Sequence, residues 1–178
     1  LPDFTARYRY TGKWGHLQVS AFAALLQYRF TEGGKEDISQ FGLNLSGQMN
    51  VFQHDYFIYQ VVGGPGSGRF RSGLSAAPDN NQHLTALDDL GYTAGYCHYW
   101  LPSLSSLIVY NSGGVQNTGG QDNSSLHKVD YLATNLIWQF APKTMAGMEY
   151  IWGKRTDKND ATGTANRIQF SIKHSFNM

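Results

Sequence analysis

The chain has 178 residues, of which 41% are hydrophobic, 14% aromatic and 15% charged, and its formal net charge is +1. A soluble domain usually carries about 25% charged residues, so this composition favours a sheet wall with one apolar and one wet surface, and the near-neutral charge gives no support to a nucleic-acid partner. The sequence has no run of about 18 apolar residues, which excludes a transmembrane helix, and its single cysteine, Cys97, excludes a disulfide within the chain.

Polar and apolar residues alternate along most of the chain, as expected for β-strands, whose successive side chains point to opposite faces. In the first segment, Phe4, Ala6 and Tyr8 alternate with Arg7 and Arg9. The pattern predicts nine strands, most of them near the roughly 9–11 residues that a tilted membrane strand needs. In chain order, the predicted strands cover residues 3–10, 15–30, 40–51, 56–63, 90–100, 106–112, 129–140, 145–155 and 167–176.

The second predicted strand changes phase near its end. Its apolar set begins with Leu17 and Val19 but continues through Leu26 and Tyr28, an odd number of residues later. We expect a β-bulge beside Leu25, because one extra residue would keep all these side chains on one face. For the fourth, fifth and sixth strands, the pattern leaves the choice of face open.

The connections alternate between short and long. Short turns are expected at residues 11–13, 53–55, 102–105 and 142–144, and long polar connections at 31–39, 64–89, 113–128 and 156–165. This asymmetry is typical of outer-membrane β-barrels, which have short periplasmic turns and long extracellular loops. It also predicts that the chain ends on the short-turn side. The sequence therefore predicts an all-β fold, a transmembrane antiparallel up-and-down β-barrel, as a single domain over residues 1–178.

The odd strand number has a consequence for closure. Bacterial single-chain barrels have even strand counts, and an open sheet edge cannot sit in lipid, where its backbone groups find no hydrogen-bond partner. We infer that the chain is the C-terminal part of a larger barrel whose N-terminal strands, with the signal peptide, are absent. The alternative is that eight strands close a small barrel by themselves.

Several segments resemble the DcaP-like outer-membrane porins. They are DFTARYRY at residues 3–10, WGHLQV at 14–19, GYTAGYCHYW at 91–100 and ANRIQFS at 165–171, together with the glycine run that ends at Gly68-Arg69-Phe70. The resemblance spans nearly the whole chain but only the C-terminal half of the family's barrel. It implies a sixteen-stranded, trimeric channel in the outer membrane of a Gram-negative bacterium, in contact with lipid and lipopolysaccharide. It also implies passage of small organic anions, dicarboxylates among them, without a cofactor.

The polar face of the predicted wall is mostly cationic. Pores lined by Arg and Lys favour anions, because a low-dielectric wall concentrates their field in the lumen. The residues that we expect to line the lumen and to bind solute are Arg7, Arg9, Arg29, Arg155, Arg167 and Lys173, with Glu149 as the one clear acid. The alternative is that acids of the absent strands balance these charges.

Two pairs of arginines are each separated by a single residue in the sequence. Arg7 and Arg9 are two residues apart on one strand, so both would point inward about 7 Å apart. That spacing suits two carboxylates of one solute, or one carboxylate and water. Arg69 and Arg71 follow the fourth strand and are candidates for a mouth or constriction loop. For this second pair, a position on the loop surface is the alternative.

The sequence offers little for catalysis or metal binding. None of its six histidines has metal-ligand spacing. His83 lies in a predicted loop near Asp79 and Asp88, and His127 in another near Asp122 and Asp130, as an Asp/His protease would need. Polar loops contain such pairs by chance. We therefore predict a porin, a passive diffusion channel for small anions, that is not an enzyme. The alternatives are a soluble β-sandwich binding module and a small outer-membrane barrel with an enzymatic or anchoring role.

Overall fold

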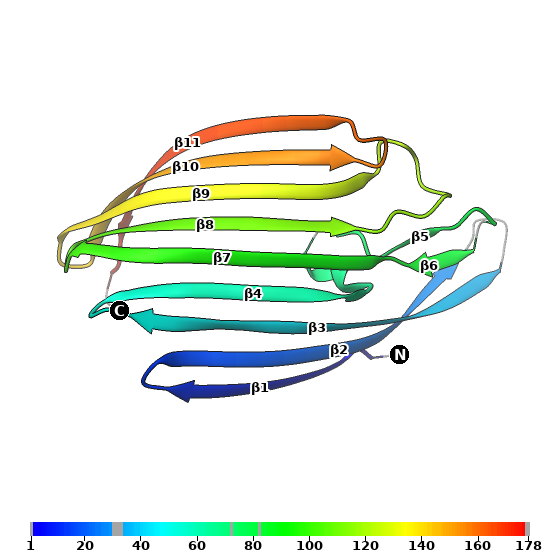
Figure 1. The fold of residues 1–178 in the computed structure, drawn as a ribbon, viewed down its shortest axis with the longest axis horizontal. Coiled ribbons are helices and arrows are strands. Elements are labelled where there is room, and N and C mark those ends of the chain that lie inside the picture. Colours follow the sequence, from blue (N-terminus) through cyan, green and yellow to red (C-terminus); the bar gives the residue numbers. More distant parts are fainter. Residues whose placement is uncertain (1, 30–33, 72, 82, 177–178) are drawn as a thin grey trace.

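One antiparallel sheet of nine strands forms the body of the molecule. The computed structural model describes residues 2–29, 34–71, 73–81 and 83–176. All nine predicted strands are present, and they lie side by side in chain order (Figure 1). Their bounds are β1 (Phe4–Gly12), β2 (Gly15–Arg29), β3 (Lys35–Val51), β4 (Asp55–Pro65), β7 (Asp88–Leu101), β8 (Leu104–Val115), β9 (Leu126–Ala141), β10 (Thr144–Asp157) and β11 (Thr162–His174).

The topology is up-and-down, and it excludes the sandwich alternative. Within the described ranges, the other sheet is a two-stranded one formed by β5 (Ala76–Pro78) and β6 (Leu84–Ala86), which is too small to be a sandwich layer. In the same ranges, no helix is long and apolar enough to cross a membrane. The edge strands β1 and β11 each have a neighbour on one side, and nearly all their residues are exposed.

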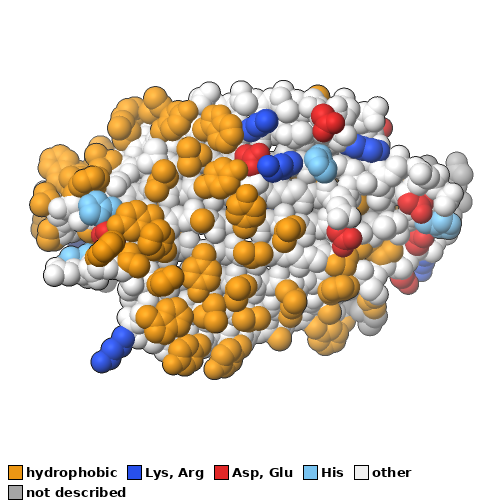
Figure 2. All heavy atoms as spheres, viewed as in Figure 1, with side chains coloured by type: hydrophobic (Ala, Val, Ile, Leu, Met, Phe, Trp, Pro, Cys, Tyr) orange, Lys and Arg blue, Asp and Glu red, His pale blue; other side chains and the backbone are white. Residues whose placement is uncertain are grey.

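Pairing register separates the two faces of the sheet. One row of cross-strand neighbours consists of Tyr8, Val19, Leu45, Val61 and Tyr92. All five side chains are apolar or amphipathic, and all are exposed. Figure 2 shows apolar side chains spread over this face, with most of the charged side chains between the upper middle and the right-hand end. We call it the outer face, and the opposite face, which carries Arg7 and Arg9, the inner face.

The predicted bulge beside Leu25 is wrong. β2 pairs with β3 over its whole length without a register shift. Leu26 and Tyr28 therefore face inward, where they line a pocket together with Leu74 and Leu84 of the long connection after β4. The apolar phase changes because this end of the strand packs against that connection, whereas the rest of its apolar face is outward.

The same register corrects the position of Arg29. Residues separated by an even number share a face of an unbroken strand, so Arg29 lies on the outer face with Val19 and Leu25, opposite Lys35 of β3. Arg29 is therefore not a residue of the inner face. Phe30, the predicted last residue of this strand, lies outside the described residues.

The connections are sorted as predicted, with changes in length. The turns 13–14, 52–54, 102–103 and 142–143 lie at one end of the sheet (Figure 1), and the last described residues lie there too, since the Ser175 backbone N–H donates to the Lys143 carbonyl oxygen. At the other end, 66–87 and 116–125 are long, but two predicted long connections are not. β3 begins at Lys35, so much of the predicted 31–39 connection is strand, and β10 and β11 extend and leave only 158–161 of 156–165. β11 ends at His174, so Phe176 lies beyond the strand that was predicted to include it.

The long connection between β4 and β7 folds back on the sheet and has structure of its own. It contains the short 3-10 helix η1 (Ser67–Phe70) and the β5–β6 pair. Gly66 starts the helix with a positive φ of 86°, and a Cβ there would lie 2.6 Å from the Cβ of Gln40. Ala77 and Leu87 of the connection bury against Val115 of β8 in a small apolar core. We call residues 66–87 the inner loop.

Close strand packing at Gly47 generates a prediction. A Cβ there would overlap the carbonyl oxygen of His16 and lie 2.5 Å from the Tyr59 hydroxyl oxygen. We expect Gly47→Ala to lower the free energy of unfolding by about 1–3 kcal/mol, since the neighbours must move. Gly163→Ala is the matched control, because a Cβ there meets nothing within 4 Å. Urea unfolding of the detergent-solubilised protein measures both, and equal midpoints would contradict this packing.

Candidate functional site

A ladder of polar side chains crosses the inner face. Asn44 donates through Nδ2 to Ser20 Oγ at 3.2 Å and accepts at Oδ1 from Gln60 Nε2 at 2.7 Å. Further along the sheet, Thr93 Oγ1 donates to Asn111 Oδ1 at 3.0 Å. Because these residues come from five different strands, their register alone aligns them. Such donors and acceptors can replace part of the hydration shell of a polar solute.

The inner loop is attached to the sheet by a buried ion pair. Arg71 donates through Nε and Nη2 to Asp89 Oδ1 and Oδ2 at 2.9 and 2.6 Å, and the Asp89 side chain is 0% exposed. Ser67 Oγ also donates to this carboxylate, at 3.4 Å. Such a bidentate, charge-assisted pair is both strong and specific in geometry.

Two glycines make room for this ion pair. Gly91 and Gly113 face each other across β7 and β8. A Cβ at Gly91 would lie 2.6 Å from Nε of Arg71, and one at Gly113 would overlap the guanidinium. The guanidinium therefore lies directly on the backbone of the sheet. We call the Arg71–Asp89 pair and these two glycines the latch.

Further contacts hold the far end of the inner loop. Glu36 of β3 accepts from the backbone N–H of Leu84 at 2.8 Å and lies 3.2 Å from Nδ1 of His83. From the 116–125 connection, Thr118 Oγ1 donates to the carbonyl oxygen of Pro78 at 2.5 Å. The inner loop is thus tied to β3, β7 and a second connection, which gives it one position against the wall.

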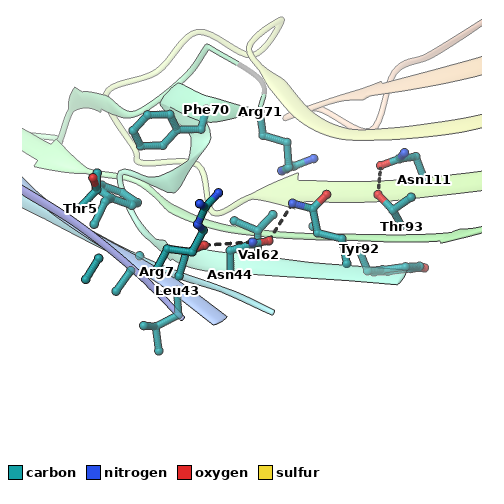
Figure 3. A pocket seen from close by; sticks show the side chains of 17 residues that line it. Thr5, Arg7, Leu43, Asn44, Val62, Phe70, Arg71, Tyr92, Thr93 and Asn111 are labelled. Carbon is teal, nitrogen blue, oxygen red and sulfur yellow. Dashed lines mark hydrogen bonds between the residues drawn. The ribbon is translucent and has the colours of Figure 1, made fainter. Parts of the chain in front are cut away.

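A cavity of about 660 Å³ lies between the inner loop and the polar ladder. Figure 3 shows Arg7 entering it from β1 and Arg71 from the inner loop, with Phe70 beside them. Asp89 balances the charge of Arg71. Arg7 makes no ion pair with any residue that the structure describes. In this cavity, Arg7 is therefore the cation whose charge is available to a solute.

The predicted loop arginines both lie on the inner loop, and each has an acidic partner. Arg69 Nη1 lies 3.0 Å from Asp3 Oδ2, and both side chains are partly exposed. Its guanidinium carbon is 5.3 Å from the centroid of the Phe70 ring. Arg69 therefore ties the inner loop to the segment just before β1, whereas Arg71 belongs to the latch.

The other predicted cations of the inner face are spread over the sheet. Arg9 lies next to Arg7 on β1, whereas Arg167 and Lys173 are on β11, at the opposite edge. Like Arg7, none of these three forms an ion pair within the described part of the chain. The sheet thus carries uncompensated positive charge along both of its edges.

The register places Arg155 and Glu149 on the inner face, but both side chains already have partners within the chain. Arg155 Nε donates to Asp157 Oδ1 at 2.6 Å and Nη2 donates to the Ser124 carbonyl oxygen. Glu149 Oε2 accepts from Gln169 Nε2 at 2.7 Å. Glu149 therefore has a neutral partner, and Arg155 anchors the connections at its end of the sheet.

Sequence reasoning missed several residues of this site. Asn44 and Gln60 are polar residues in strands where polar and apolar residues alternate. Their position on the inner face follows once the register is known. Asp89 had no such signal, because its partner Arg71 is 18 residues away along an irregular connection. The motif Gly68-Arg69-Phe70 gives no sign of where Phe70 points, and in the structure its ring faces the cavity (Figure 3).

The candidate catalytic pairs do not form. Asp79 accepts from the backbone N–H groups of Asn81 and His83, so it shapes a turn. His127 Nδ1 contacts Asn117. Over the described residues there is no group of three or more His, Cys, Asp or Glu side chains that could hold a metal ion.

Comparison with known proteins supports the fold. The crystal structure of the outer membrane channel DcaP of Acinetobacter baumannii matches this chain with a TM-score of 0.85 at 19% sequence identity, over 99% of this chain and 52% of that chain. The predicted resemblance is therefore confirmed for the fold, and the chain spans about half the length of that channel. No family profile matches the sequence, and no curated protein matches it.

The latch generates a prediction that limited proteolysis tests. Asp89→Asn leaves the Arg71 guanidinium against a neutral amide, and breaking a buried pair costs about 3–5 kcal/mol. We expect trypsin to cleave after Arg69 or Arg71 about tenfold faster or more, because the inner loop opens more often. Asp3→Asn is the control, since it breaks a partly exposed pair worth about 0–1 kcal/mol. Equal cleavage of Asp89→Asn and the parent would contradict the latch.

Proposed function

We propose that this chain forms about half of the wall of a porin, an outer-membrane diffusion channel for small anionic solutes, dicarboxylates among them. The observation that carries the proposal is a single sheet with an apolar outer face and a polar inner face that bears uncompensated cations. The likeness of its fold to half of the DcaP channel supports it. In this proposal, further strands pair with the open edges of β1 and β11 and close the barrel.

Two carboxylates on the outer face are buried and hydrogen-bonded, as expected for a surface in contact with lipid. Asp55 and Asp130 both lie on this face, and each is only 7% exposed. Asp55 accepts hydrogen bonds from the Tyr96 hydroxyl and the Tyr99 backbone N–H, and Asp130 accepts from Tyr110 and Ser112. Charged groups near lipid are tolerated when they are paired or hydrogen-bonded in this way.

The inner face favours anions by its charge balance. Among the described residues, no acid forms an ion pair with Arg7, Arg9, Arg167 or Lys173. Near β11, the inner-face acid Glu149 likewise has no cationic partner within the described ranges, since it accepts from Gln169. The unpaired cations thus outnumber this unpaired acid. A water-filled lumen with such a wall concentrates anions and repels cations. Transport by this route is passive, so the proposal includes no catalytic step.

Dicarboxylates fit the pair on β1. Arg7 and Arg9 are two residues apart on one face of a regular strand, which places their Cα atoms about 7 Å apart. Each guanidinium can hold a carboxylate by two parallel hydrogen bonds. A short dicarboxylate could therefore contact both arginines along the wall.

Charge selectivity tests the proposal. The full-length protein would be reconstituted in a planar bilayer, and the reversal potential measured across a KCl gradient. We expect preference for chloride, and a decrease of that preference in the double variant Arg7→Gln, Arg9→Gln, because the lumen loses two positive charges. Lys154→Gln is the control, since Lys154 lies on the outer face opposite Asp130. Preference for potassium, or no conductance, would contradict the proposal.

The two faces can be tested with neighbouring residues of one strand. We expect Leu45→Arg to reduce folding into lipid vesicles, because a cation on the lipid face costs about 2–4 kcal/mol near the bilayer midplane. Ser46→Arg should fold like the parent, since Ser46 points to the inner face. The folded fraction is measured by the electrophoretic shift between unheated and heated samples. Equal folding of both variants would argue against a lipid-facing outer surface.

A further inference from the structure

Phe70 presents an apolar surface where a water-filled channel should be polar. Phe70 as a whole is 61% exposed, and it lines the cavity rather than the outer face. It packs edge-on against Phe22, with ring centroids 4.8 Å apart. Phe22 itself lies on the inner face, opposite Gly42, where a Cβ would overlap its ring. The wall thus makes room for an aromatic pair inside the cavity.

The opposite side of the same cavity is built for an anion. Ser20 pairs in register with Arg7 across β1 and β2, so their Cβ atoms are about 5 Å apart. Ser20 Oγ accepts a hydrogen bond from Asn44, which leaves its hydroxyl proton free to donate elsewhere. A carboxylate between them could accept from both the Arg7 guanidinium and the Ser20 hydroxyl.

The polar side of the cavity, at Ser20, and its aromatic side, at Phe22, are separated by a distance that suits one small molecule. Ser20 and Phe22 are two residues apart on the inner face of β2, which is about 7 Å. Val62, on the same face, adds apolar surface to the cavity. The second guanidinium of the cavity, Arg71, is already occupied by Asp89. The cavity therefore offers one free cation beside an aromatic surface.

We propose that this cavity is a binding subsite for monocarboxylates with an apolar, best aromatic, body, whose carboxylate sits at Arg7 and Ser20 and whose ring lies against Phe22 and Phe70. The inference rests on the proposed channel function and narrows it, since it names a solute class for one part of the lumen. It differs from the dicarboxylate contact at Arg7 and Arg9, which needs two free cations and no apolar surface.

A ligand-observed NMR titration of the detergent-solubilised full-length protein tests the subsite without requiring conductance. The probes are benzoate, acetate and benzamide. We expect benzoate to bind about tenfold more tightly than acetate, because the ring buries apolar surface against two phenylalanines. Benzamide, which has the ring but no charge, should bind more weakly than benzoate.

Three variants assign the contacts. Phe70→Gln should reduce the benzoate affinity to that of acetate, and Phe70→Leu should retain part of the difference. Arg7→Gln should weaken both carboxylates. Lys154→Gln is the control, because it removes a cation of the outer face, opposite Asp130 and outside the cavity lining, and it should leave benzoate binding unchanged.

The outcomes separate this inference from the proposed function. Equal affinities of benzoate and acetate, or a Phe70→Gln variant that binds benzoate like the parent, would overturn the subsite, while chloride preference in the bilayer would leave the channel in place. Loss of folding in Phe70→Gln and Phe70→Leu, with weak benzoate binding by the parent, would also overturn it and would assign Phe70 to packing against the rest of the barrel.

Discussion

Unbroken pairing between the neighbouring strands from β1 to β7 is the constraint on which the site of this structure depends. Side chains alternate with a period of two, so a slip of one residue would exchange the inner and outer faces of a strand. β2 pairs with β3 from Gly15 to Arg29 without such a slip. That continuity places Arg7, Ser20 and Asn44 on one polar row, and it also moves Arg29 to the outer face.

The inner loop converts a plain wall into a site. Beside the cavity it is held by a buried ion pair, Arg71–Asp89, which fits only because Gly91 and Gly113 leave the backbone of β7 and β8 uncovered. A bidentate pair of this kind fixes the orientation of the chain as well as its distance. The latch therefore places Phe70 over the wall and gives the cavity a closed side.

Ion pairs decide which of the charged side chains can act on a solute. Arg71, Arg69 and Arg155 have acidic partners, so their fields are largely cancelled at a distance. Arg7 has none among the described residues, and it lies beside polar groups whose hydrogen bonds are already directed. A count of arginines would treat these residues alike, but their neighbours give them different roles. The three paired arginines anchor connections, whereas Arg7 is left to contact a solute.

The amino-acid sequence by itself determined the existence of the nine strands, the end of the sheet at which each connection lies, and the shared face of Arg7 and Arg9, because alternation and turn chemistry are local properties. The tertiary structure decided the rest. Leu26 and Tyr28 look like outer-face residues until the inner loop is seen to cover them. The pairing of Arg71 with Asp89, and the meeting of Phe70 with Phe22, join segments that are far apart in the chain. No local pattern encodes such contacts, since they depend on where a folded connection comes to rest against the sheet.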